Sequence, residues 1–131
     1  MDGAGRESGF SLVELLVVMV IIGILAAIAV PVLLNQRASA FDTSVRADLR
    51  EVARIMETYY VDEGEYAGDL EVLAAAVPPP TQLSGDNEVA LVPAFTDEQA
   101  YCLVGTSPHS DSTIHYDSDG GGLLAPGAPC T

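Results

Sequence analysis

Residues 9–34 read GFSLVELLVVMVIIGILAAIAVPVLL, and this stretch decides the fold. From Leu15 to Leu34 it runs for twenty residues without a charge, which is the length that a helix needs to cross a hydrocarbon core of about 30 Å. We therefore predict one membrane-spanning helix. Glu14 stands at the edge of this helix, where a charged side chain in lipid costs roughly 2.5 to 3.5 kcal/mol, so it is a candidate functional residue.

A cleaved secretory signal is the alternative interpretation of the same stretch. Its apolar region would begin near Leu15, and its cleavage site would be the A-x-A-like stretch Ala27-Ile28-Ala29. Two features disfavour it. The segment before the apolar run holds Arg6 against Asp2 and Glu7, whereas such signals begin with a positive region. In addition, a carboxylate inside a discarded segment would serve no purpose.

Charge is distributed unevenly along the 131 residues. The chain has 5 Lys plus Arg against 19 Asp plus Glu, and residues 55–131 carry 13 acids and no Lys or Arg. Phosphate backbones are bound by clustered Lys and Arg. We therefore expect no direct binding of nucleic acid by the soluble part, which is long enough for one modest domain.

A motif at the start of the apolar run points to a protein family. Gly9 and Phe10 are followed by Glu14, four residues after Phe10, and then by an unbroken apolar segment with Pro31 near its end. This order resembles the class III signal and N-terminal helix of type IV pilins and of the pseudopilins of type II secretion. The resemblance continues through the next amphipathic stretch to about Tyr66.

The resemblance implies a course of maturation. A leader, residues 1–9, would be cut after Gly9 by a prepilin peptidase, and the new amino terminus of Phe10 would be methylated. Residues 10–34 would first anchor the chain in the lipid of the plasma (inner) membrane, with the N-terminus cytoplasmic. They would later form the core of a homo-oligomeric helical filament, built by an inner-membrane pilus assembly platform and displayed as an extracellular pilus.

Glu14 is expected to pair with the amine of Phe10 on an adjacent copy in that scheme. General electrostatics supports the idea, because a desolvated charge without a partner is strongly unfavourable and the pair would therefore favour assembly. The positive-inside rule argues for the opposite orientation. Arg6 precedes the span while Arg37 and Arg46 follow it, which by itself would place the body in the cytoplasm. The peptidase motif requires Gly9 on the cytoplasmic side, and the two cysteines, Cys102 and Cys130, favour an oxidising compartment. Both features favour a soluble part outside the cytoplasm.

Residues 35–131 are expected to form a globular pilin head. It would open with an amphipathic helix at 35–63, whose apolar residues recur every three or four positions and would face a sheet; this stripe is Phe41, Val45, Leu49, Val52, Met56, Tyr59 and Tyr60. Ion pairs Asp42–Arg46 and Glu51–Arg54 are expected on its solvated side. Gly64 is the predicted helix stop. Gly23 and Pro31 predict a kink in the membrane half.

The remaining segments predict a small antiparallel sheet. A short helix over Asp69–Ala76 would be capped by Asp69 and stopped by prolines 78–80. Three strand-like runs follow, at 88–95, 100–106 and 113–117, within a β meander at 87–117. The predicted fold class is therefore α+β, with a long N-terminal helix packed on an antiparallel sheet of about three to four strands and a C-terminal disulfide loop.

Cys102 and Cys130 are the two cysteines of the chain. A spaced pair in an exported domain predicts one disulfide, and the alternative is two buried free thiols. The tail after Asp119 has no periodicity and is predicted to be a loop tied back by Cys130. In pilins the corresponding disulfide-bounded region, here 102–130, tends to be exposed and variable, so the resemblance places partner recognition there.

Two side-chain clusters suggest other chemistry. A short run holds potential triad members, but without a G-x-S-x-G nucleophile elbow it does not indicate a hydrolase, and we expect no enzymatic activity; the run is His109, Ser110, Asp111 and His115. Asp117 and Asp119 resemble the opening of a calcium loop but do not fit an EF-hand. Because major pseudopilins hold calcium in a C-terminal loop, these two residues are weak calcium candidates, and no other cofactor is expected.

The leading hypothesis is a non-enzymatic structural subunit of a type IV pilus. A pseudopilin of a type II secretion system or of a competence pseudopilus is the rival within the same superfamily, although the acidic head disfavours a role in DNA uptake. A membrane-anchored or secreted binding module that forms no filament is the rival from another class.

Overall fold

The computed structural model describes residues 9–76 and 83–131. The chain divides into two compact units, Met1–Gln36 and Arg37–Thr131, and each is described here by itself. One helix, α1 (Leu12–Glu63), contributes to both units and is assigned without interruption through Gly23 and Pro31. The predicted kink at these two residues stays a prediction.

The first half of α1 exposes its apolar side chains. From Leu12 to Leu34 every described residue is exposed, and the large side chains of this segment retain at least 48% of their accessible surface. Within the described ranges, α1 is the helix long and apolar enough to cross a membrane by length and composition. The apolar side chains of its first half thus remain accessible in the described structure.

The second half of α1 buries the predicted apolar stripe. Val45, Leu49, Val52 and Met56 are buried, whereas Tyr60 remains 37% exposed. The helix ends at Glu63. Gly64 follows with a φ of +83° and donates its N–H to the Tyr60 carbonyl oxygen at 2.9 Å, as expected for a glycine that ends a helix.

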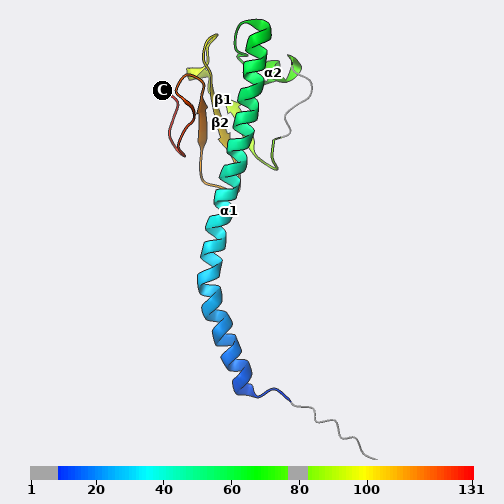
Figure 1. Cartoon of the computed structure of the whole chain (residues 1–131), viewed down its shortest axis with the longest axis vertical. Coiled ribbons are helices and arrows are strands. Elements are labelled where there is room, and N and C mark those ends of the chain that lie inside the picture. Colours follow the sequence, from blue (N-terminus) through cyan, green and yellow to red (C-terminus); the bar gives the residue numbers. More distant parts are fainter. Residues whose placement is uncertain (1–8, 77–82) are drawn as a thin grey trace, which may run out of the picture. The chain divides into compact units, whose positions relative to one another are not determined.

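A four-stranded antiparallel sheet packs against this part of α1. Its strands follow the chain order β1-β2-β3-β4, and Figure 1 shows β1 and β2 lying beside the helix. The strands are β1 (Glu88–Leu91), β2 (Cys102–Thr106), β3 (Ile114–Asp117) and β4 (Gly122–Leu123). Val45, Leu49, Val52 and Met56 of the helix stripe form one hydrophobic core with Tyr101, Leu103 and Ile114. The predicted fold class and meander are therefore confirmed.

Two features of the sheet differ from the prediction. The first strand was expected to reach residue 95, but it stops at Leu91 and a 3₁₀ turn, η1 (Pro93–Phe95), follows. Pro93 has no N–H to donate to the sheet, so the ladder cannot continue through it. The tail was expected to be entirely loop, yet Gly122 and Leu123 pair with Asp117 and Tyr116. A two-residue strand is too short to show periodicity.

The disulfide prediction is confirmed. Cys102 at the start of β2 is bonded to Cys130, with 6.3 Å between their Cα atoms and 28 residues between them in sequence. Both cysteines are buried. The bond ties the C-terminal tail to the sheet beside the core.

The short helix and one of the two predicted ion pairs are present in the structure. Helix α2 (Leu70–Ala76) follows Asp69, whose Oδ1 accepts the Glu71 N–H at 2.8 Å. The expected stop at prolines 78–80 lies outside the described residues.

Arg54 pairs with Glu51 at 2.6 Å, as predicted. The predicted Asp42–Arg46 pair is wrong, because Asp42 instead accepts a hydrogen bond from the Ser110 hydroxyl.

Candidate functional site

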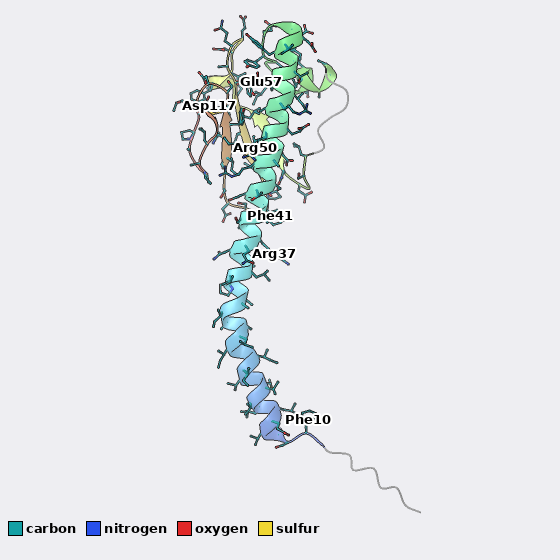
Figure 2. All side chains as sticks on the ribbon, viewed as in Figure 1. Phe10, Arg37, Phe41, Arg50, Glu57 and Asp117 are labelled. Atoms are coloured by element: carbon teal, nitrogen blue, oxygen red, sulfur yellow. A yellow bond between two sulfur atoms is a disulfide. The ribbon has the colours of Figure 1, made fainter. Side chains whose placement is uncertain are left out.

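The candidate site lies where α1 begins. Gly9, Phe10 and Ser11 are not helical, and the helix starts at Leu12. Phe10, labelled in Figure 2 at this end of α1, is 80% exposed. The Gly9–Phe10 peptide bond therefore lies in exposed, non-helical chain just before a helix, where a peptidase can reach its backbone.

Ser11 and Glu14 form a capping box at this helix start. The Glu14 carboxylate accepts the Ser11 N–H at 2.8 Å, and the Ser11 hydroxyl accepts the Val13 N–H at 3.3 Å. The S-x-x-E spacing lets the third helical residue reach back to the cap residue while the cap side chain bonds into the first turn. The negative charge also lies at the positive end of the helix dipole, where carboxylates are stabilised.

The capping box fixes where the Glu14 charge is held. Its carboxylate is bonded to the N–H of Ser11, which is one residue from the nitrogen of Phe10. In the uncut chain that nitrogen is a neutral amide, whereas cutting after Gly9 would convert it into an amine that is positively charged at neutral pH. The Glu14 side chain is thus held beside a position that would gain a positive charge on cleavage.

The weak calcium candidates lie in the turn between β3 and β4. Asp117 is buried and accepts the Gly120 N–H at 3.0 Å and the Thr131 N–H at 3.2 Å. A side chain at Gly120 would collide with this carboxylate, because a Cβ there would lie 2.5 Å from its oxygen. In the described part of the chain, no group of three or more potential metal ligands comes together.

The two carboxyls of this turn titrate as a pair. Burial raises the pKa of Asp117, but hydrogen bonds from the Asp119 carboxyl and from the N–H groups of Thr131 and Gly120 outweigh burial and leave that pKa lowered. The hydrogen bond to Asp117, followed by its negative charge, raises the pKa of Asp119. The arrangement suits one shared proton, or a cation in its place.

The residues that resembled a triad are not arranged as one. The Ser110 hydroxyl donates to the Asp42 carboxylate, and the His109 ring packs on Phe41 with centroids 4.6 Å apart. His109 also approaches Asp86, at 3.7 Å. The serine is therefore bonded to a carboxylate rather than to a histidine, and these contacts join loops to α1.

Sequence reasoning missed a buried polar cluster around Asp48. The Asp48 side chain accepts hydrogen bonds from the Ser84 N–H and hydroxyl, at 3.0 and 2.8 Å, and from the Asn87 amide at 2.7 Å. These bonds join the loop before β1 to α1. The sequence did offer one sign of this cluster: Asp48 lies on the same helix face as the apolar positions 45, 49 and 52.

Comparison with known proteins decides the family. Residues 5–30 match the prokaryotic N-terminal methylation motif. The chain is 32% identical to the type IV wide pilus major component of Thermus thermophilus, over 85% of this chain and 80% of that protein. The chain belongs to the type IV pilin and type II secretion pseudopilin family. The predicted resemblance is thereby confirmed, and, since proteins of this family are structural, so is the expectation that the chain is not an enzyme.

Relatives of this pilin-family chain come from both branches. It is 33% identical to the type II secretion system core protein G of Dickeya chrysanthemi, over 88% of this chain and 80% of that protein. It is 37% identical to the core protein G of Pseudomonas aeruginosa over 76 residues, where it spans about half, 54%, of that protein's length. Family membership is thus shared by filament and secretion proteins at similar identity.

Proposed function

We propose that this chain is the structural subunit of a type IV pilus. In the proposal it enters the inner membrane as a precursor, is cut after Gly9, is methylated on the amine of Phe10, and is assembled into an extracellular filament. The observation that carries the proposal is the helix start, where Phe10, the residue after Gly9, is exposed and precedes a helix that Ser11 caps and whose third residue, Glu14, bonds back to Ser11.

The exposed apolar half of α1 supports the filament. The large apolar side chains between residues 12 and 34 are uncovered, and the head keeps its own core without them. In the membrane this surface would face lipid, and in a filament it would pack against the same surface of other copies. The Glu14 carboxylate would then meet the Phe10 amine of an adjacent copy, since each member of that pair needs a partner once water is excluded.

The proposed maturation requires two partners in the inner membrane. A prepilin peptidase would act on the Gly9–Phe10 bond, and an inner-membrane assembly platform would extract the subunit from the lipid. The domain limits that we propose are a leader at 1–9, a filament-core helix at 10–34 and a head at 35–131.

A pseudopilin of a type II secretion system is the second candidate. Core protein G relatives from several bacteria support it, and so does the Asp117 and Asp119 pair, which could hold a cation in the C-terminal turn. The assembly chemistry at Gly9, Phe10 and Glu14 would be the same, but the product would be a short periplasmic filament.

Two measurements on the native host test the proposal. Surface fibres sheared from cells should contain this chain as their bulk component, and its intact mass should equal residues 10–131 plus one methyl group and minus two hydrogens for the disulfide. A chain in the fibres that begins at Met1 or Val30 would contradict the maturation proposed here. If the processed chain is found in the cell envelope and not in surface fibres, the pseudopilin candidate is favoured instead.

A further inference from the structure

Positive charge in the head is confined to one helix. Its four arginines, Arg37, Arg46, Arg50 and Arg54, all lie on α1, and residues 55–131 have neither Lys nor Arg. Positions 46, 50 and 54 follow a four-residue spacing, which places them along one side of the helix. We call these three residues the arginine face.

The arginine face is turned to solvent. Arg50 and Arg54 are exposed and Arg46 is half-buried, and Figure 2 shows Arg50 on the part of α1 that lies in the head. Arg54 is paired with Glu51. Among residues 9–76 and 83–131, Arg46 and Arg50 have no ion-pair partner.

A groove of opposite charge lies beyond the end of α1. Glu65, Asp97 and Glu98 line it together with Tyr66, and the three acids are exposed. The Tyr66 N–H donates to the Glu98 carbonyl oxygen at 3.3 Å, which joins the two segments that form the groove. We call this set the acidic groove.

The acidic groove holds negative charge at neutral pH. The Asp97 carboxylate accepts the N–H groups of Gln99 and Ala100, both at 2.8 Å, and these bonds lower its pKa. The side chains of Glu65 and Glu98 have no hydrogen-bond partner within the described ranges. Carboxylates beside an aromatic ring suit an arginine, which can bond to the oxygens and stack on the ring.

The acids of the groove have no arginine partner in the described ranges, where the ion pairs are Arg54–Glu51 and His109–Asp86. Arg50 and the acidic groove are therefore both available to another copy of the chain.

We infer that the arginine face of one copy docks in the acidic groove of the next copy. The two surfaces are different patches of one chain, so the contact is heterologous, and a heterologous contact that does not close into a ring propagates as a filament. This inference rests on the proposed filament. It adds a second, electrostatic contact between heads, separate from the apolar core and from Glu14.

Crosslinking tests the contact, because the chain contains no lysine. The conservative change Arg50→Lys keeps the charge and introduces a unique side-chain amine. A carbodiimide joins an amine to a carboxylate without a spacer, so purified fibres of this variant should give covalent dimers, and their joined peptides should link position 50 to Glu65, Asp97 or Glu98. Wild-type fibres should give none through position 50.

Charge reversal gives an independent readout in cells. Arg50→Glu and Glu98→Arg should each lower the fibre yield about tenfold, since like charges replace an opposite pair, and the double variant should recover most of it. Glu88→Arg is the matched control, because Glu88 is an exposed acid on β1 outside the groove, and it should leave the yield unchanged.

The outcomes separate the inference from the proposed function. If fibres contain the chain, but Arg50→Lys gives only monomers or links to other carboxylates and Arg50→Glu assembles normally, the docking inference is wrong and the filament proposal stands. The same crosslinking should also be carried out on subunits that detergent has first dispersed. If these subunits give the position-50 dimers as readily as fibres do, the contact does not belong to the fibre. If fibres lack the chain altogether, both proposals fail.

Discussion

Glu14 makes a capping hydrogen bond, and the pairing that we propose with the Phe10 amine would place a different requirement on it. The capping box needs an acceptor oxygen at the third helical position, and glutamine can supply one as well as glutamate. Pairing with an amine requires the negative charge itself. The capping hydrogen bond to Ser11 therefore makes it possible to separate helix capping from assembly at a single residue.

We predict that Glu14→Gln keeps the capping box and leader cleavage but lowers the fibre yield more than tenfold, because the Phe10 amine loses its anionic partner. Glu14→Ala should lose the fibres and also leave the Ser11 N–H without its acceptor, which weakens the capping box. Intact mass reports cleavage, hydrogen exchange at the first turn reports the cap, and electron microscopy counts the fibres. Normal fibre numbers with the Gln variant would refute the pairing.

Asp119 offers a second test at the residue scale, through the dependence of stability on pH. The pKa of Asp119 is raised in the folded chain, so its protonated form stabilises the fold. This contribution is fully present below the pKa of the unfolded chain, near 3.9, and is lost as pH rises through the pKa of the folded chain. The lowered pKa of Asp117 works in the other direction: its contribution is present above the unfolded value and is lost as pH falls through the folded one.

We therefore predict that Asp119→Asn raises the melting temperature at pH 7 by a few degrees, because an amide donates to Asp117 without needing a proton. The gain should shrink as pH falls through the raised pKa of Asp119, because the native side chain then carries the proton itself. Thermal melts across this pH range measure it. If calcium occupies the turn, the wild-type chain should gain stability in millimolar calcium while the Asn variant gains less; an equal response would remove the calcium candidate.

At the scale of elements, one close approach determines how the sheet meets α1. Gly105 on β2 has no side chain, and a Cβ built there would lie 2.6 Å from a Val45 methyl and 3.0 Å from Leu49. Both helix residues are fully buried. A side chain at position 105 would therefore collide with these two helix side chains.

Gly105→Ala should lower the free energy of unfolding by about 1 to 3 kcal/mol, because the packed core cannot admit the extra methyl group without moving β2 from the helix. Urea unfolding of the purified chain measures the change. Gly68→Ala is the matched control, since a Cβ there would meet nothing within 4 Å, and it should be nearly neutral. Equal stabilities for the two variants would show that the strand and helix can separate at little cost.

Elements were predictable to different degrees for physical reasons. The stripe from Val45 to Met56 repeats over several turns, so its buried face could be identified from spacing. Strand β4 has two residues and could not show a period. The role of Asp48 was hidden because its partners, Ser84 and Asn87, are 36 and 39 residues away in sequence, and no local pattern reports such a contact.

At the scale of the whole molecule, the head holds the entire hydrophobic core. Every buried core residue among those described lies between Val45 and Cys130, and the compact unit that contains them begins at Arg37. The apolar half of α1 contributes exposed surface and no buried residue. Stability of the head and assembly through the helix are therefore separable properties.

A fragment of residues 37–131 should consequently fold alone, stay soluble without detergent and form no fibres. Its melting temperature should match that of the full chain in detergent within a few degrees, because the same core and disulfide are present. Circular dichroism and analytical ultracentrifugation measure both properties. A fragment that is unfolded would show that the head depends on residues before Arg37.

The sequence by itself determined the family motif, the membrane-length helix, the apolar stripe and the excess of acids, because each is a local pattern of spacing or composition. The tertiary structure alone decided the other features. It joined Asp48 to Ser84 and Asn87, set Gly105 against Val45, and formed an acidic groove from segments about thirty residues apart. Those contacts depend on where the chain turns and which faces meet, and long-range packing rather than local preference determines both.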